Sequence, residues 1–383
     1  MTTTNGQALL DWLASQRPAM LALLEDLVNT DSGSYDKAGV DAVGQRIRGF
    51  LDSQGIAHDT IANDRFGDVV RASVGKGANT SILLMGHRDT VFPKGEASRR
   101  RFRIDNGRAY GPGVADMKAG LVMNAFVLAA FQKFGGAPAP LVGLFTSDEE
   151  IGSPSSRPVI EAEARRARAV FNSEPGRPSG AVVTGRKGGV FMQCAVVGKA
   201  AHSGGAFEQG ISAIEEVARK IIALHALTDI PKGITVNIGL VSGGQTVNTV
   251  APNAACEIDL RYITPADRAM MLEKIERIVT TSYVPGTSAK LEIFGEFLPV
   301  VETAEGKRLF QHYVACAKEV GLSVKGEFTG GCADSGFAAG VGATTLCGTG
   351  PIGGKAHTPD EYLEVESLVP RAQTLALAVM RLE

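Results

Sequence analysis

One stretch near residue 85 constrains this chain most. The continuous apolar run 82–84 leads directly into the turn 86–89, which contains His87 and Asp89. Unbroken apolar runs are typical of strands that are buried on both faces of a sheet. Residues two apart on extended backbone share a face, so His87 and Asp89 are expected on the same side. The chain must therefore bury a strand and present an imidazole and a carboxylate at its end.

Helical and strand patterns alternate over the first half of the chain and again at its end. Apolar residues at helical spacing alternate with short apolar runs, which predicts an α/β sheet covered by helices on both faces. The expected helices are 9–28, 40–51, 119–131, 303–320 and 365–382, and the expected strands are 67–74, 81–86, 141–145, 169–172 and 343–347.

The pattern changes between residues 188 and 297. Four strands and two helices are expected there in the order strand, helix, strand, strand, helix, strand, which is typical of a ferredoxin-like α+β unit. Their ranges are 190–197, 209–227, 234–241, 254–262, 266–281 and 289–296. We therefore predict a larger domain of residues 1–187 and 298–383, with a smaller domain of residues 188–297 inserted into it.

Composition excludes several classes of function. The chain has 383 residues and a formal net charge of −2, and no Lys/Arg block with interleaved aromatic residues occurs, so nucleic acid is not expected as a partner. Five cysteines without a C-x-x-C pair favour reduced thiols. The first residues lack the basic start and apolar run of a signal peptide, and we find no stretch apolar enough to span a bilayer. We expect a cytoplasmic protein without membrane contact.

Further acids and one further histidine occupy strand ends or turns like the one after residue 85. Taken singly, Asp116 also fits a helix N-cap, and the Glu149-Glu150 pair also fits a solvated acidic turn. Ligands gather at the carboxyl ends of strands in α/β sheets, and metal-dependent hydrolysis needs several ligands held on rigid backbone with a base beside them. The coincidence predicts a metal centre built from His87, Asp116, Glu149-Glu150, Glu174 and His357.

Eight motifs resemble the M20 family of metallopeptidases, and most closely its glutamate carboxypeptidase branch. They are GHRDTV, YGPGVADMKAG, TSDEEIGS, NSEP, GKAAHSG, DLRY, GGCADS and AHTPDEY, and the resemblance covers nearly the whole chain. It implies a zinc-peptidase-type catalytic α/β domain with an inserted lid domain that commonly forms a homodimer. It also implies two zinc ions per subunit. Manganese and cobalt are compatible with the same nitrogen and oxygen ligands.

The resemblance also implies individual roles. Asp116 would bridge the two metals, followed by a cis peptide to Met117, and Glu149 would be the general base. Asp89 would brace the imidazole, since metal-bound histidines usually donate their second N–H to a carboxylate or carbonyl. Of the remaining ligands, His87 and Glu174 would complete one metal site, and Glu150 and His357 the other.

Three residues of the inserted domain are candidates for substrate contact. By resemblance, His202 would donate to the oxyanion, in dimers at the opposite subunit's site, and a turn histidine without such a role is the alternative. Arg261 is a candidate clamp for a substrate carboxylate, and a surface ion pair explains it almost as well. Asn248 is a candidate donor to the same end of the substrate. The segment 295–299 carries Glu296 and lacks the arginine of some glutamate-releasing relatives, which leaves the acyl group open.

These features predict a metal-dependent hydrolase that cleaves an amide bond next to a free carboxylate in a small-molecule substrate, with glutamate as a possible product. An N-acyl-amino-acid amidohydrolase with the same machinery is the alternative. A non-catalytic binding protein on the same fold would lack a ligand or the base, and none is missing here. The serine α/β-hydrolase class is excluded, because no G-x-S-x-G motif occurs.

Overall fold

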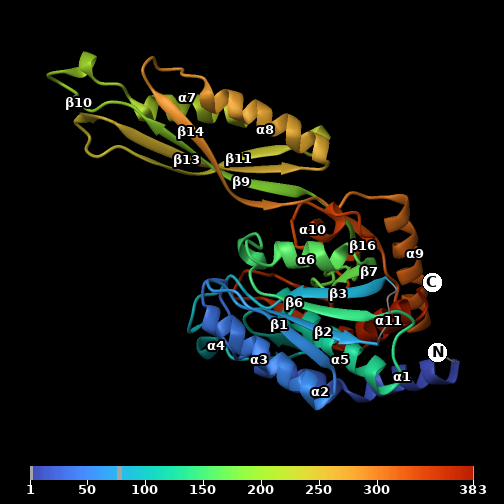
Figure 1. Ribbon diagram of the computed structural model, residues 1–383. Coiled ribbons are helices and arrows are strands. Elements are labelled where there is room, and N and C mark those ends of the chain that lie inside the picture. Colours follow the sequence, from blue (N-terminus) through green and yellow to red (C-terminus); the bar gives the residue numbers. More distant parts are fainter. Residues whose placement is uncertain (1–2, 76–79, 383) are drawn as a thin grey trace. The chain divides into compact units, whose positions relative to one another are not determined.

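The apolar run around residue 83 forms strand β3 (Ser81–His87), every residue of which is buried. It lies in the middle of an eight-stranded sheet with the order β1-β2-β6-β3-β7-β16-β8-β15 (Figure 1). Strands β6 (Leu141–Thr146) and β7 (Ala167–Asn172) flank β3 and run parallel to it, as β16 (Thr345–Cys347) does to β7. The carboxyl ends of β3, β6 and β7 therefore share one edge. The other strands are β1 (Ala57–Ile61), β2 (Val69–Val74), β8 (Val182–Arg186) and β15 (Gly326–Thr329).

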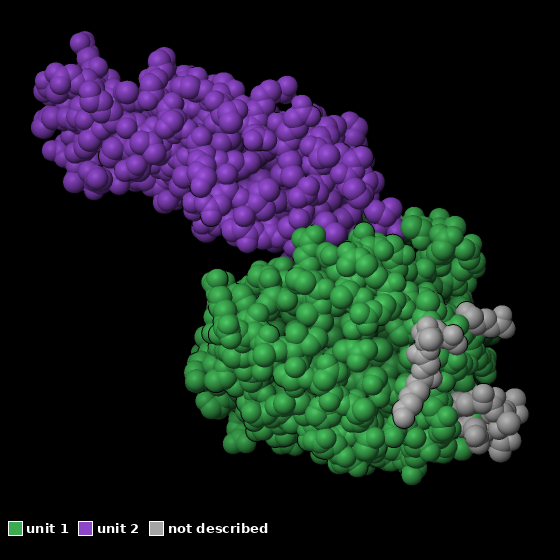
Figure 2. Space-filling model, in the orientation of Figure 1, with its two compact units in different colours: residues 1–185, 302–329, 333–383 green, residues 186–301, 330–332 purple. Residues whose placement is uncertain are grey.

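The computed structural model describes residues 3–75 and 80–382. The chain divides into two compact units (Figure 2): unit 1 is Met1–Gly185, Glu302–Thr329 and Ala333–Glu383, and unit 2 is Arg186–Val301 and Gly330–Cys332. Unit 2 thus begins slightly before residue 188 and ends slightly after residue 297. Contacts of Arg186 explain both differences. Its backbone pairs with Val300, which groups the residues just after 297 with unit 2. Its guanidinium donates to the carbonyls of Gly331 and Cys332, which groups 330–332 with the same unit.

Helices cover both faces of the unit 1 sheet. Helices α5 and α11 pack together on one face with α1 and α2, and α6 packs with α10 on the other (Figure 1). The single helix expected over 9–28 is wrong: α1 ends at Ser15 and α2 begins at Arg17, because Pro18 suits only the first turn of a helix. The helices are α1 (Thr3–Ser15), α2 (Arg17–Val28), α3 (Lys37–Ser53), α4 (Glu96–Arg99), α5 (Ala119–Lys133), α6 (Arg157–Ala164), α9 (Ala304–Glu319), α10 (Ser335–Gly340) and α11 (Leu368–Met380).

The expectation that no stretch is apolar enough to span a bilayer is also wrong. The helical segment Val114–Lys133 is long and apolar enough by composition, but 94% of its most apolar window is buried inside the fold. All residues from 119 to 131 are buried. This segment is the central core helix of unit 1, which explains its apolar composition without a membrane.

A small antiparallel sheet in unit 1 positions two loops side by side. Its order is β17-β18-β5-β4, with β17 (Gly353–Gly354), β18 (Tyr362–Glu364), β5 (Arg108–Tyr110) and β4 (Arg103–Asp105). The loop between β17 and β18 carries His357, and the segment after β5 leads to Asp116. Because β18 pairs with β5, these two distant segments of the chain are brought together.

Unit 2 has the predicted ferredoxin-like order, which confirms the fold class. The antiparallel sheet β11-β13-β9-β14 carries helices α7 and α8, and β13 alternates buried and less buried residues as a sheet covered on one face should. Its elements are β9 (Gly188–Val197), β10 (Ala201–His202), α7 (Ala213–His225), β11 (Thr235–Gly243), β12 (Thr249–Val250), β13 (Asn253–Tyr262), α8 (Pro265–Thr280) and β14 (Ser288–Phe297).

Candidate metal centre

Three neighbouring strands deliver side chains to one edge of the unit 1 sheet. His87 is the last residue of β3, and Glu174 follows shortly after the end of β7. Glu149 and Glu150 lie in a short 3-10 helix, Glu149–Ile151, just beyond β6. Parallel strands place their carboxyl ends together, so residues far apart in the sequence meet here. Asp116 joins them from the turn before α5.

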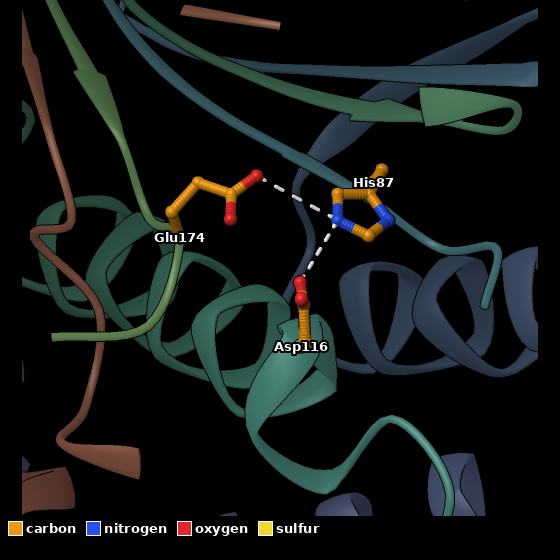
Figure 3. Close-up of side chains that lie close together, drawn as sticks. All are labelled: His87, Asp116 and Glu174. Atoms are coloured by element: carbon orange, nitrogen blue, oxygen red, sulfur yellow. Dashed lines mark hydrogen bonds and ion pairs between the residues drawn. The ribbon is translucent and has the colours of Figure 1, made fainter. Parts of the chain in front are cut away.

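Asp116 lies between two histidines. Its Oδ1 is 3.2 Å from His87 Nε2, and its Oδ2 is 3.4 Å from His357 Nε2. The second ring is also 3.1 Å from Glu150 Oε2, and the first is 3.6 Å from Glu174 Oε1. Figure 3 shows the His87, Asp116 and Glu174 side chains converging. The two carboxylate oxygens of one residue therefore face two separate groups of possible ligands.

The donor chemistry of these groups suits divalent metal ions. In each of the sets His87, Asp116, Glu174 and Asp116, Glu150, His357, the candidate ligand atoms lie within 4.8 Å of one another. Imidazole nitrogens and carboxylate oxygens are the ligands of catalytic zinc sites. Several carboxylates gathered in a buried site repel one another unless a cation neutralises them. The residues present therefore fit a pair of divalent ions that share Asp116.

Electrostatics within the centre reflect its burial and its excess of acids. Burial raises the pKa of Glu150 to about 7. Burial also raises the pKa of Glu149 well above its ordinary value, with added repulsion from the Glu174 and Glu150 carboxylates. Hydrogen bonds to Asp116 and Glu150 raise the pKa of His357 to about 10. A bound cation would favour the ionised acids instead, since metal charge inverts the usual effect of burial on a carboxyl group.

Asp89 holds the parts of the centre in place. It is fully buried, and its oxygens accept hydrogen bonds from the backbone N–H groups of Glu149 and Glu150 (3.1 Å each) and from Ser34 Oγ (2.7 Å). Nδ1 of His87 lies 3.1 Å from the Asp89 carbonyl oxygen and 3.4 Å from Oδ1. This fixes the imidazole with Nε2 toward Asp116, so the geometry fits the bracing role expected for Asp89.

Two further buried carboxylates belong to the centre but were not predicted from the sequence. Glu361 is fully buried and accepts hydrogen bonds of 2.9–3.0 Å from three backbone N–H groups within the loop 113–116. Asp334 accepts from Thr146 Oγ1 at 3.1 Å and from Ser153 Oγ. Glu361 occurs in the motif AHTPDEY and Asp334 in GGCADS, and their presence in these motifs was the sequence signal that could have marked them as part of the site. Both fasten the segments that carry candidate ligands.

The peptide bond from Asp116 to Met117 is cis, as the family resemblance implied. The two residues have non-helical backbone angles within the turn Val114–Lys118. The Met117 side chain turns back toward β3, where its Sδ lies 3.3 Å from the His87 backbone nitrogen. Met117 therefore packs under the centre.

His202 and Asn248 lie together in unit 2. Strand β10 pairs with β12 so that His202 is opposite Thr249, and the Ser203 N–H donates to the Asn248 carbonyl at 3.0 Å. The backbone N–H groups of Gly204 and Gly205 donate to His202 Nδ1 at 3.2 and 3.1 Å. Two donors on Nδ1 place the proton of the neutral ring on Nε2. His202 is exposed and can donate from that nitrogen.

Arg261 and Asn248 lie toward opposite ends of β13 within one chain, so their predicted joint contact with one end of a substrate would need residues of two subunits. Arg261 ends β13, whereas Asn248 precedes the other end of that strand. From Asn253 to Arg261 the strand spans about 26 Å, at roughly 3.3 Å per residue. Figure 1 shows β10 at the end of unit 2 remote from the start of β9, which pairs with the Arg261 end of β13.

The Arg261 guanidinium already has partners. Nε and a terminal nitrogen donate to Asp259 at 2.7 and 3.0 Å, and the other terminal nitrogen lies 2.8 Å from Cys332 Sγ. Asp259 thus orients the side chain while occupying one edge of its donor fork. Glu296 forms an ion pair with Arg268, so its charge is already neutralised.

Comparison with known proteins shows which family this chain resembles and which relatives share its sequence. Residues 83–381 match the model of peptidase family M20/M25/M40. The chain is 30% identical over 375 residues to carboxypeptidase G2 of Pseudomonas sp. (strain RS-16), covering 96% of this chain and 90% of that protein. It is 27% identical over 384 residues to acetylornithine deacetylase of Edwardsiella ictaluri (strain 93-146), covering 93% and 96%.

A solved structure of low identity has the same fold. The YXEP protein of Bacillus subtilis, described as a dinuclear metal binding peptidase from the M20 family, superposes with a TM-score of 0.67 at 18% identity, covering 96% of this chain and 98% of that one. Together with the family match over most of the chain, these relatives confirm the resemblance found in the motifs. The chain belongs to peptidase family M20/M25/M40.

Proposed function

We propose that this protein hydrolyses an amide bond next to a free carboxylate, as a metallocarboxypeptidase acting on N-acyl or peptidyl amino acids. The placement of Asp116 between two ligand groups, with Glu149 beside them, carries the proposal. In this proposal, His87 and Glu174 would hold one metal ion, Glu150 and His357 would hold the other, and Asp116 could serve both. Zinc is the proposed metal because of the mixed nitrogen and oxygen ligands.

Glu149 is placed to act as the general base. The Glu149 Oε2 lies 3.9 Å from His87 Nε2, and ligand atoms of His87, Glu149 and Glu150 also lie within 4.8 Å of one another. We assign Glu149 the role of base because, unlike His87 and Glu150, it belongs to neither set of possible ligands that contains Asp116. When bound, the two ions would lower the pKa of a shared water and polarise the scissile carbonyl. The Glu149 carboxylate would take the proton of that water and deliver it to the leaving nitrogen. Nε2–H of His202 would donate to the oxygen that becomes negative.

An N-acyl-amino-acid amidohydrolase is the second candidate, favoured by the similarity to acetylornithine deacetylase. The two candidates differ in the acyl side of the substrate and share the machinery. A hydrolysis screen of N-acyl amino acids and dipeptides, with zinc, manganese or cobalt restored after chelation, tests both. No hydrolysis of any member with any metal would reject the proposed function.

We predict that Arg261 recognises the free carboxylate. Replacing Arg261 with alanine should lower kcat/KM for an N-acyl amino acid. The loss should correspond to roughly 2–5 kcal/mol of transition-state stabilisation, as when one partner of a buried, hydrogen-bonded charge pair is removed. Lysine should restore only part of the loss, because it lacks the planar fork. The measurement compares the N-acyl amino acid with its C-terminal amide. If the unaltered enzyme cleaves both equally well, Arg261 does not have this role.

We also propose a homodimer formed through unit 2, in which each site combines Arg261 of one chain with His202 of the other. The separation of these residues within one chain supports this. Co-expressed His202→Ala and Arg261→Ala chains should recover about a quarter of the unaltered activity, since half of the dimers are mixed and one of their two sites is intact. Activity no higher than that of either variant alone would contradict the shared site.

A further inference from the structure

Two of the five cysteines lie directly opposite each other in the sheet of unit 2. Cys194 of β9 and Cys256 of β13 are partners in the register of these two antiparallel strands (Figure 1). Directly opposed residues on antiparallel strands project from the same face of the sheet, with Cα atoms about 4.5–5.5 Å apart. Disulfides bridge Cα atoms that are about 4.4–6.8 Å apart. The backbone therefore already holds the two residues at a separation that a disulfide can span.

The two thiols meet inside the core of unit 2. Both are buried in one apolar cluster with residues of helices α7 and α8. A hydrogen bond joins the thiols, and it lowers the pKa of the Cys194 thiol and raises the pKa of the Cys256 thiol. This is the effect expected when Cys256 donates the bond and Cys194 accepts it, because a donor stabilises the ionised form of its partner. Cys194 is therefore the thiol with the greater thiolate character.

A buried lysine adds positive charge beside the pair. Lys220 of α7 is fully buried, and its Nζ lies 2.7 Å from Glu216 Oε1. The ammonium also donates to the carbonyls of Ile278 and Val279 at 3.0 and 2.8 Å, which fixes its position. Its charge lowers the pKa of Cys194 further, while burial and the Glu216 carboxylate oppose this. A thiolate is favoured beside a lysine, and it is the form that reacts with oxidants.

Burial decides which oxidants suit the pair. Cys194 and Cys256 are almost completely withdrawn from solvent. Thiol oxidation depends on exposure as well as on thiolate character. Hydrogen peroxide is uncharged and not much larger than water, so it enters a packed core more readily than a bulky thiol reagent does. A peroxide is therefore the class of oxidant that fits this site.

We propose that Cys194 and Cys256 form a redox-active pair, which hydrogen peroxide converts to a reversible disulfide. The Cys194 sulfur attacks the peroxide, the O–O bond breaks, and Cys194 becomes a sulfenic acid as one water leaves. The Cys256 sulfur then attacks the Cys194 sulfur, the S–O bond breaks, and a second water leaves with the Cys256 proton. Two thiols thus lose two electrons and two protons, and one peroxide becomes two waters. This inference does not depend on the proposed hydrolase function.

The disulfide would fasten the two inner strands of the unit 2 sheet. Strands β13 and β9 occupy the middle of the order β11-β13-β9-β14. A cross-link restricts the unfolded chain more than the folded one, and it therefore favours the folded form. The oxidised pair would stabilise unit 2, and a small thiol would release it by thiol–disulfide exchange.

The test treats the folded, full-length protein with hydrogen peroxide, then unfolds it, alkylates the remaining thiols and maps its peptides by mass spectrometry. We expect a linked pair of peptides containing Cys194 and Cys256, about 2 Da lighter than the sum of the reduced peptides because two hydrogens are lost. Dithiothreitol added before alkylation should abolish the link. Cys316→Ala removes a buried thiol of α9 in unit 1 and, as the control, should leave the link unchanged. Absence of the linked pair in the unaltered protein overturns the proposal.

Two variants test the order of the steps. In Cys256→Ala the peptide that contains Cys194 should gain one oxygen, whereas in Cys194→Ala the Cys256 thiol should remain reduced. The opposite result overturns the roles assigned to the two thiols.

Thermal unfolding of the unaltered protein gives a measurement that needs no change in the core. The unfolding temperature should rise after oxidation and return to its first value after reduction, because the cross-link is then removed. Equal unfolding temperatures in the linked and reduced forms would overturn the claim that the disulfide stabilises unit 2.

Discussion

Glu149→Gln should reduce kcat by about 10²–10⁴-fold, the range typical of removing a general base. Glutamine has nearly the same shape but cannot accept a proton from water. In the proposed assignment Glu149 is the base and not a ligand, and its backbone N–H rather than its carboxylate is held by Asp89. Metal content should therefore stay near two ions per chain, and substrate affinity should be retained. Steady-state kinetics together with metal analysis of the purified variant measure both quantities.

The control for this prediction is Glu25→Gln, which makes the same chemical change at an exposed position of α2. That variant should keep normal turnover. A near-normal kcat in Glu149→Gln would assign the base to another group. Loss of metal from Glu149→Gln would instead show that Glu149 is a ligand, which would remove the distinction drawn between it and Glu150.

Asp116→Asn should lower metal content below two ions per chain and reduce activity by more than about 100-fold, the upper range seen when even the outer partners of metal ligands are removed. The reason is the position of the two carboxylate oxygens, one facing His87 and the other facing His357. An amide offers one oxygen and no negative charge, so it cannot serve both sides. Elemental analysis after dialysis against a weak chelator measures the loss.

Asp105→Asn is the matched control, because Asp105 lies on the exposed strand β4 of the same unit. It should keep both ions and full activity. If Asp116→Asn retained two tightly bound ions, the two ligand groups would have to be independent, and the bridging role would be wrong.

The sequence predicted the two-unit architecture because the two parts differ in kind. Strands of unit 1 such as β3 are buried on both faces, whereas β13 of unit 2 alternates. It also indicated that His87, Glu149 and Glu174 meet, because parallel strands bring their carboxyl ends to one edge. Short polar elements such as β1 and the hairpin β4–β5 were missed, since they bury little apolar surface and show no clear period.

Features set by tertiary contacts were not predictable in the same way. Glu361 resembles a surface acid in its loop, and only the approach of the loop 113–116 buries it and supplies three N–H donors.

The pairing of Arg261 with Asp259 did have a signal in the sequence, because residues two apart on a strand share a face. The break at Gln16 was likewise marked by Pro18, although apolar spacing continued across it.

The central claim is that two metal ions share Asp116, and anomalous diffraction from crystals grown with zinc tests it most directly. We expect two peaks. One should lie about 2.0–2.2 Å from ligand atoms of His87, Glu174 and Asp116, and the other at the same distance from Glu150, His357 and Asp116. Side chains more than about 4 Å from any peak, or a single peak that does not touch Asp116, would contradict the account, since zinc–ligand bonds are near 2 Å.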